Sequence, residues 1–226
     1  MQNYKFILLI ALSAFFASCA PTNTGVFSTD DLISYRNNYQ RISSYQFNIA
    51  YGVFHSGRGR VEMTGMYSLQ NSRTAGLTEL GQIDLVIDFS DRDETRPGTV
   101  EVPIVDGQIS GVTHLGYGEP DFGVGWDGTL AITEGYVTLT DPGLGGGSRP
   151  PQLITFKARG TLTQISPDGE GGSVRRVDVG ADGTDSTLSF EGQFVQQVEF
   201  VSPLLSAVGN VTPSTGQSDF YLEEVR

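Results

Sequence analysis

Apolar and polar side chains alternate over residues 82–89, and this pattern limits what the chain can fold into more than any other feature. Every second position is apolar, and most of the positions between are polar. The apolar set is Ile83, Leu85, Ile87 and Phe89, and the polar set is Gln82, Asp84 and Asp88. A period of two places the two sets on opposite faces of an extended strand. The stretch therefore predicts a strand with one buried face and one face in water.

Stretches with the composition of strands recur from residue 45 to the end of the chain. They are rich in β-branched and aromatic residues and are separated by Gly, Pro and Asp. Besides 82–89, they cover residues 45–54, 58–69, 99–105, 108–112, 129–140, 152–164, 173–179, 187–200 and 220–225. Short strands at this spacing are typical of antiparallel sandwiches and barrels. We expect an all-β fold, with a single antiparallel β-barrel of about eight to ten strands.

Several turn signals divide these stretches. The Asp-Gly pair at 106–107 is typical of a tight hairpin turn and predicts a strand on either side of it. Glu134 and Gly135 likewise predict a turn between two short strands. Residues 114–128 are rich in Gly, Pro and aromatic side chains and predict a long loop, and residues 141–151 predict a Gly-rich and Pro-rich loop that cannot hold a strand.

One short helix is expected before the strands. Ser28 or Thr29 is a suitable N-cap, and Asp30 and Asp31 put negative charge into the first turn. Apolar side chains then follow at helical spacing, which predicts a helix over residues 29–40.

The N-terminus has the organisation of a secretory leader. Lys5 gives it a positive charge, residues 6–16 are almost entirely apolar, and small residues come next. The apolar run is shorter than the roughly 20 residues that a permanent membrane helix needs. Residues 1–18 are therefore predicted to be a signal peptide.

The end of this leader resembles the lipobox of bacterial lipoproteins. Ala17 and Ser18 stand directly before Cys19, although Phe16 replaces the usual leucine. The resemblance implies that Cys19 is acylated, with palmitate among its lipids, and becomes the mature N-terminus. Ala20 differs from the aspartate that retains such proteins at the inner membrane, so the family rule points to the outer membrane, on its periplasmic or its cell-surface side.

Three segments are expected in the chain. They are the signal peptide, a lipidated tether with the short helix over residues 19–44, and a barrel domain over residues 45–226. The formal net charge is −12, and removal of Lys5 with the leader makes the mature chain one unit more negative. Such a chain has no basic face for phosphates, so we expect no nucleic-acid partner. We expect contact with the membrane through the lipid anchor, and the sequence leaves the oligomeric state open.

Some strand motifs resemble the barrel domain of transferrin-binding protein B-like lipoproteins. Residues 59–67 are similar to the opening strand of those barrels, and residues 128–130 and 160–162 are similar to their recurring Gly-Thr-Leu steps. Residues 189–194 stand where the family has a glycine and phenylalanine motif, but its usual Gly-Pro-x-Ala-x-Glu-x-Gly-Gly ending is absent. The resemblance covers roughly residues 45–200 and implies a small barrel behind a lipid anchor. It does not extend to transferrin binding.

The sequence contains no motif for catalysis, a cofactor or a metal that has the required spacing. We therefore expect no enzymatic activity, no cofactor and no metal site. Two groups of acidic residues are interpreted as solvated turns and not as calcium sites. They are Asp88, Asp91, Asp93 and Glu94, and Asp178, Asp182 and Asp185.

Trp126 is the best single candidate for a binding contact, with Tyr117 and Phe122 in the same expected loop. The alternative is that Trp126 closes one end of the barrel. Three functions stay open: a binding module for a protein or nutrient carrier, a lipocalin-like carrier of an apolar ligand inside the barrel, and a hydrolase. Large inward side chains favour a filled interior over a carrier. These are Phe89, Phe156, Phe190, Phe194 and Phe200.

Overall fold

The computed structural model describes residues 27–45, 54, 59–70, 77–91, 93–96, 98–116, 123–141, 150–165, 174–177, 188–196, 204–212 and 216–226. Within these residues it has one helix and eleven strands, and the strands belong to a single sheet. The elements are α1 (Thr29–Ser43), β1 (Arg60–Gln70), β2 (Leu77–Asp88), β3 (Asp93–Arg96), β4 (Thr99–Gly116), β5 (Gly123–Asp127), β6 (Leu130–Thr140), β7 (Leu153–Gln164), β8 (Val174–Val177), β9 (Leu188–Val195), β10 (Ser206–Thr212) and β11 (Asp219–Glu224).

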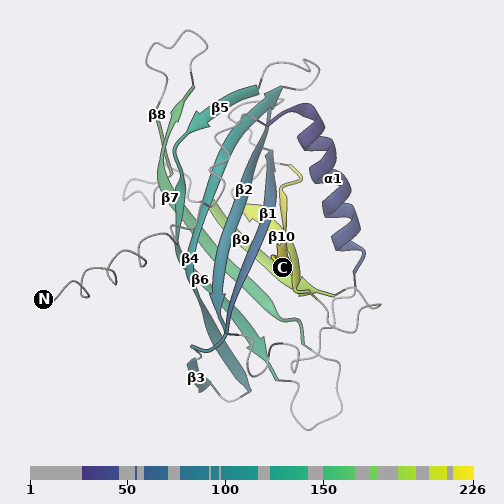
Figure 1. Ribbon diagram of the computed structural model, residues 1–226, viewed down its shortest axis with the longest axis vertical. Helices are drawn as coiled ribbons and strands as arrows, with labels where there is room; N and C mark the ends of the chain where they lie inside the picture. Colours follow the sequence, from purple (N-terminus) through teal and green to yellow (C-terminus); the bar gives the residue numbers. More distant parts are fainter. Residues whose placement is uncertain are drawn as a thin grey trace, which may run out of the picture.

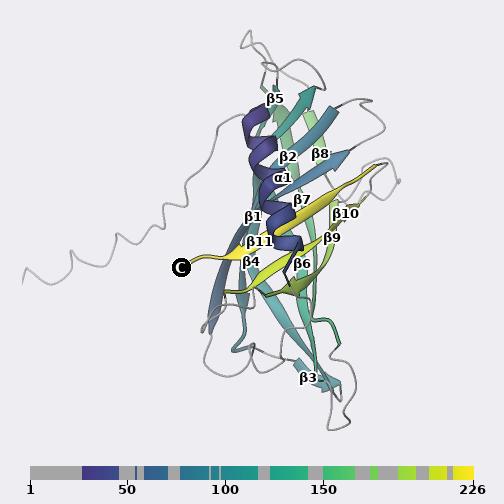
Figure 2. The ribbon, with the colours of Figure 1, turned by 90° about the vertical axis from the view of Figure 1, so that its right-hand side faces the viewer.

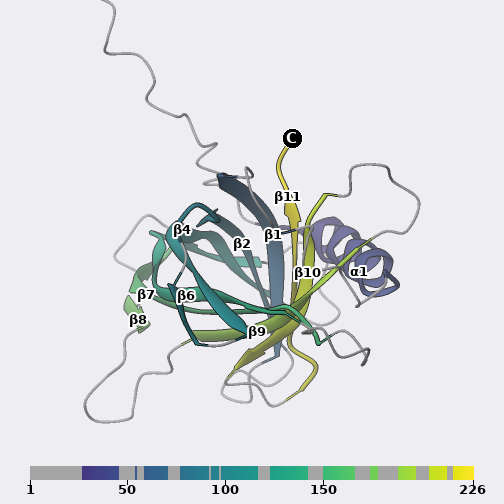
Figure 3. The same cartoon turned by 90° about the horizontal axis from the view of Figure 1, so that it is seen from below.

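The sheet closes on itself, as the view along the strands in Figure 3 shows. Every pairing is antiparallel, and the ring runs β1, β2, β4, β6, β7, β9, β10, β11 and back to β1. The strands of the ring follow one another in chain order, which makes it an up-and-down barrel. The short strands β3, β5 and β8 extend its margins by pairing with β4 or β7. The predicted antiparallel barrel with a short helix before it is confirmed (Figure 1).

The predicted hairpin turn at 106–107 is wrong. β4 runs through Asp106 and Gly107, which pair with Val86 and Leu85 of β2. A register shift near Ile87 bends the strand there without ending it, as β-bulges do. Gly107 leaves little room for a side chain, because a Cβ atom there would lie 2.8 Å from Cδ1 of Ile132 and 3.0 Å from the main-chain oxygen of Asp84.

Two further boundaries differ from the sequence prediction. Glu134 and Gly135 lie inside the single strand β6, where a register shift against β7 takes the place of the expected turn. The expected loop over 114–128 holds the end of β4 and the whole of β5, so His114 and Trp126 are strand residues. Local turn and loop signals are a poor guide in both places because pairing with neighbouring strands decides the backbone conformation.

The interior of the barrel contains a large core of apolar side chains. Seven large aromatic residues are almost completely buried: Tyr67, Phe54, Phe89, Phe156, Phe190, Phe194 and Phe220. Phe156 and Phe190 stack with their ring centres 4.5 Å apart, and Phe220 packs edge-on against both. The alternation predicted for residues 82–89 is confirmed, since Leu85 and its apolar partners belong to this core.

Two glycines on neighbouring strands make room for one of these rings. Gly192 of β9 pairs with Gly209 of β10. A Cβ atom on Gly192 would lie 2.7 Å from the ring of Phe220, and one on Gly209 would lie 2.6 Å from it. The ring therefore occupies the space that two side chains would otherwise fill, a pairing that stabilises glycines in sheets.

α1 lies against the outside of the barrel, beside β10 and β11 (Figure 2). Ser28, one of the two expected N-cap residues, caps the helix and forms a capping box with Asp31. Tyr35 and Ile42 are buried in a second apolar cluster with outward-facing side chains of the strands, among them Leu80, Val208 and Tyr221. This cluster holds the helix on the wall of the barrel.

Candidate functional site

An open pocket of about 330 Å³ lies between α1 and the outer wall of the barrel. The helix contributes Tyr35, Arg36, Tyr39, Gln40 and Ser43, and the strand side contributes Ser68, Gln70, Gln217 and Asp219. Ser68 of β1 and Asp219 of β11 are directly opposite each other in the antiparallel pairing of these strands. This pairing brings the β1 and β11 residues of the pocket together. The volume is at the lower end of the range of about 300–1,000 Å³ that is usual for small-molecule sites.

Asp219 is the acidic group of this pocket and is buried. The residue is only 5% exposed, and Tyr35 donates its hydroxyl hydrogen to one carboxylate oxygen. The side-chain amide of Gln217 donates to the other oxygen at 3.0 Å. Both donors are neutral, and among the described residues no cation pairs with Asp219. Because a carboxylate has about four acceptor positions, Asp219 retains capacity for further donors.

The tyrosines around Asp219 are held in their protonated form. Burial raises the pKa of Tyr35 far above its ordinary value, and the nearby charge of Asp219 adds to this effect. Burial also raises the pKa of Tyr39 and that of Tyr221, which is the more buried of the two. The ring of Tyr39 stacks on that of Tyr35 with centres 6.2 Å apart. These hydroxyl groups are therefore hydrogen-bond donors and not bases or nucleophiles at neutral pH.

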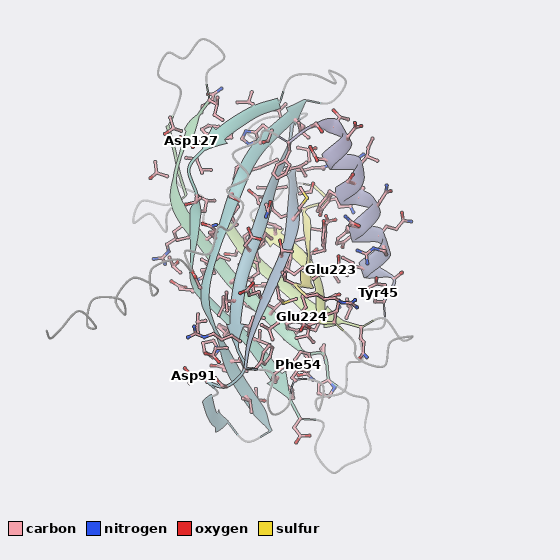
Figure 4. The ribbon with its side chains drawn as sticks, in the orientation of Figure 1. Tyr45, Phe54, Asp91, Asp127, Glu223 and Glu224 are labelled. Atoms are coloured by element: carbon pink, nitrogen blue, oxygen red, sulfur yellow. The ribbon has the colours of Figure 1, made fainter. Side chains whose placement is uncertain are left out.

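An ion pair links the C-terminal part of α1 to β11 beside this pocket. Both terminal nitrogens of Arg41 donate to Glu223 of β11, at 3.1 and 2.8 Å. Arg41 also donates to the hydroxyl of Tyr45. Tyr45 and Glu223 lie close together in Figure 4. The hydrogen bonds to Glu223 raise the pKa of Arg41 above its ordinary value. Because both nitrogens of Arg41 bond to Glu223, the contact orients the helix. An exposed ion pair of this kind adds little to the free energy of unfolding.

A second polar cluster lies inside the barrel, on the other side of β1. Tyr67 and Ser68 are neighbours that point in opposite directions, Ser68 to the pocket and Tyr67 to the core. Tyr67 donates to Glu79 at 2.7 Å, and Nε2 of His114 lies 2.7 Å from the other oxygen of Glu79. The indole N–H of Trp126 donates to Nδ1 of His114 at 2.8 Å.

This interior cluster has no free base. An indole N–H can only donate, so Nδ1 of His114 accepts and Nε2 carries the hydrogen that goes to Glu79. Both ring nitrogens are engaged, and a general base needs one that is free to take a proton from a substrate. The cluster therefore satisfies buried polar groups in the core, including Glu79, which is 1% exposed.

Of the candidates named from the sequence, Trp126 lies in the described part of the chain. Its ring packs against the core, which agrees with a side chain that closes one end of the barrel, and it is partly exposed. Cys19, Tyr117 and Phe122 lie outside the described residues, as do Phe200 and the second acidic group.

In the first acidic group, hydrogen bonds from Ser90 and Arg60 lower the pKa of Asp88. No cluster of metal-ligating side chains occurs among the described residues.

The sequence interpretation missed the pocket altogether. Its residues come from α1, from the end of β1 and from the segment that leads into β11, and no local motif links them. Residues 201–219, which include β10, were not assigned to any strand. The available signal was the polar face of the helix, where Arg36, Tyr39, Gln40 and Ser43 recur at helical spacing.

Comparison of the chain with protein-family models, with curated proteins and with solved structures found no match in any of the three. Within the described residues, α1 is neither long nor apolar enough to cross a membrane.

Proposed function

We propose that the chain is a lipid-anchored protein of the bacterial envelope that acts as a binding module without catalytic activity. The leader over residues 1–18 directs export, and acylated Cys19 holds the mature chain at the outer membrane. Residues 20–26 then form a polar tether between the lipid and α1. Attachment through lipid suits a strongly acidic chain, because anionic headgroups repel it.

The observation that carries the binding role is the combination of a large packed core inside the barrel and a pocket on its outer wall. Aromatic side chains pack against one another through the interior, while the pocket beside α1 is open and lined with polar groups. A barrel of about eight strands either fills its interior or holds one small ligand there. The packed core supports recognition on the outside, at the pocket or on the neighbouring surface.

The resemblance to transferrin-binding protein B-like lipoproteins also favours this proposal. It implies a small barrel behind a lipid anchor, an arrangement that suits a binding module for a protein or a nutrient carrier. The strand faces that point outward support contact with water, since they carry Glu62, Asp84 and Glu191. Exposed Glu134 forms ion pairs with Lys157 and Arg159 on the same surface.

The anchor is tested by metabolic labelling with a palmitate analogue in a Gram-negative host. The wild type and Ser18→Ala, which keeps a small residue before the cysteine, should both incorporate the label and fractionate with the outer membrane. Cys19→Ala should lose the label and remain uncleaved or become soluble. Labelling that persists in Cys19→Ala would refute the lipoprotein assignment.

The choice between a surface module and an interior carrier is tested by extraction. Purified mature protein should yield no stoichiometric apolar molecule in organic solvent or in native mass spectrometry, because core side chains occupy the interior. One bound apolar molecule per chain, lost on mutation of core residues such as Phe190, would contradict the binding-module proposal and favour the carrier.

A further inference from the structure

The side chains around the pocket present hydrogen-bonding groups that the protein does not use. In the part of the chain that the structure describes, the side chains of Arg36, Tyr39, Gln40, Ser68 and Gln70 form no hydrogen bond or ion pair. All five line the same pocket. Elsewhere on the barrel, Asp84 and Glu134 are bonded to their neighbours, whereas the described side chains of Glu62 and Glu191 are not, so the pocket differs in gathering such groups in one place.

The kinds of group present define the chemistry of the ligand. Gln40 and Gln70 each offer an amide that donates and accepts, and the hydroxyl of Ser68 does both as well. Asp219 offers spare acceptor positions, and Arg36 offers donors. A ligand with several hydroxyl groups matches this set, because every hydroxyl can donate to one group and accept from another.

Two other ligand classes fit less well. An apolar ligand would remove water from these amides and hydroxyls without replacing their hydrogen bonds, which is unfavourable. A small anion would meet Arg36 but also the carboxylate of Asp219 within the same 330 Å³. The opposite charges of Arg36 and Asp219 instead suit a ligand without net charge.

Tyr39 adds an apolar surface to the pocket. Its side chain is partly exposed and its ring is held by stacking on Tyr35. Tyrosine combines an apolar ring with a polar end. A pyranose ring has the complementary character, since one face presents mainly C–H groups and its edge presents hydroxyls.

We propose that this pocket binds a saccharide unit of one or two rings. Tyr39 packs against the sugar ring, and Gln40, Ser68 and Gln70 bond its hydroxyls from the two walls. Asp219 accepts from further hydroxyls, while Tyr35 and Gln217 hold its carboxylate in place. The assignment rests on the proposed function as a binding module, and it names the class of ligand for that module. A free sugar and the end of a glycan chain share this chemistry.

The test uses the purified mature protein in detergent, titrated with glucose, galactose, mannose, N-acetylglucosamine and their β1,4-linked disaccharides. Ligand-detected NMR identifies binders, and calorimetry gives Kd. We expect at least one of these sugars to bind, with Tyr39→Ala and Gln70→Ala each weakening it about tenfold, the effect of one lost contact. Tyr136→Ala and Gln164→Ala are the matched controls on β6 and β7, away from the pocket, and should leave Kd unchanged.

Two results would overturn the proposal. One is the absence of binding tighter than about 10 mM by every sugar in the panel. The other is binding that Tyr39→Ala and Gln70→Ala leave unchanged although circular dichroism shows them folded, because the sugar would then bind elsewhere.

A retention experiment distinguishes the two sources of the sugar. Retention of the protein on insoluble glycan, competed by the free sugar, would support a glycan chain as the ligand. Binding of the free sugar alone would support a soluble sugar. The outcome is independent of palmitate labelling at Cys19, so failure here and failure of the anchor are distinguishable.

Discussion

Tyr35 on the helix donates its hydroxyl hydrogen to the buried carboxylate of Asp219 on the last strand, 184 positions further along the chain. The same hydroxyl lies 2.8 Å from the main-chain oxygen of Asp219. β11 is also the strand that completes the ring by pairing with β1. One side chain therefore joins the start of the described chain to the closure of the barrel, and it sets the position of the carboxylate in the pocket.

Tyr35→Phe should destabilise the protein by about 1.5–3 kcal/mol, the usual effect of removing a hydrogen bond to a charged group. Gln217 would be left as the side-chain donor to Asp219. Urea unfolding followed by circular dichroism measures the change. Tyr136→Phe is the matched control because Tyr136 is 44% exposed, and it should stay within about 0.5 kcal/mol of the wild type. Equal effects of the two substitutions would show that the hydroxyl of Tyr35 contributes nothing to stability.

Stability should fall as the pH rises above about 10, the ordinary pKa of tyrosine. Burial raises the pKa of Tyr35, Tyr39 and Tyr221 in the folded protein. Above pH 10 the unfolded chain therefore binds fewer protons than the folded one, and a rise in pH favours unfolding. Stability from these groups is complete below pH 10 and decreases above it. Urea midpoints between pH 8 and 11 test this, and Tyr35→Phe should show a shallower decrease than Tyr136→Phe.

Period-two alternation predicted the architecture because it depends only on which face of a strand is buried. Residues 82–89 became most of β2 with the expected residues in the core. The helix was predicted from its capping residues and spacing, and it extends to Ser43 rather than to residue 40. These signals are local, so a single sequence contains them.

Turn signals failed where pairing with distant strands overrides local preference. Asp106 and Gly107 would suit a hairpin in isolation, but β2 and β6 pair along both edges of β4 and keep it extended. The pocket could not be predicted for a related reason. Tyr35 and Asp219 are adjacent only because the ring closes, and closure is a property of the whole chain.

Gly209→Ala should destabilise the barrel by about 1–3 kcal/mol, as overpacking of a core usually does. The added Cβ would lie 2.2 Å from the carbonyl oxygen of Glu191 and 2.6 Å from the ring of Phe220, so the two strands or the ring must move. Gly116→Ala is the control, since its Cβ would meet only Cδ2 of Leu77 at an ordinary 3.7 Å. Thermal and urea unfolding compare the two. Tolerance of both substitutions would mean that Phe220 does not fill the space over the glycine pair.

Glu79→Ala should destabilise the protein by about 2 kcal/mol or more, because it leaves buried donors on Tyr67 and His114 without their acceptor. Glu79→Gln keeps one acceptor oxygen and should cost less. Glu62→Ala is the matched control on the outer face of β1, where the side chain is exposed, and should change stability by no more than about 0.5 kcal/mol.

Trp126 is the single tryptophan and donates to His114, so its fluorescence reports on this cluster directly. Unfolding curves followed by that emission should rank the variants Glu79→Ala, Glu79→Gln and Glu62→Ala in order of increasing stability. If Glu79→Ala were as stable as Glu62→Ala, with unchanged tryptophan emission, the carboxylate would not be what satisfies Tyr67 and His114.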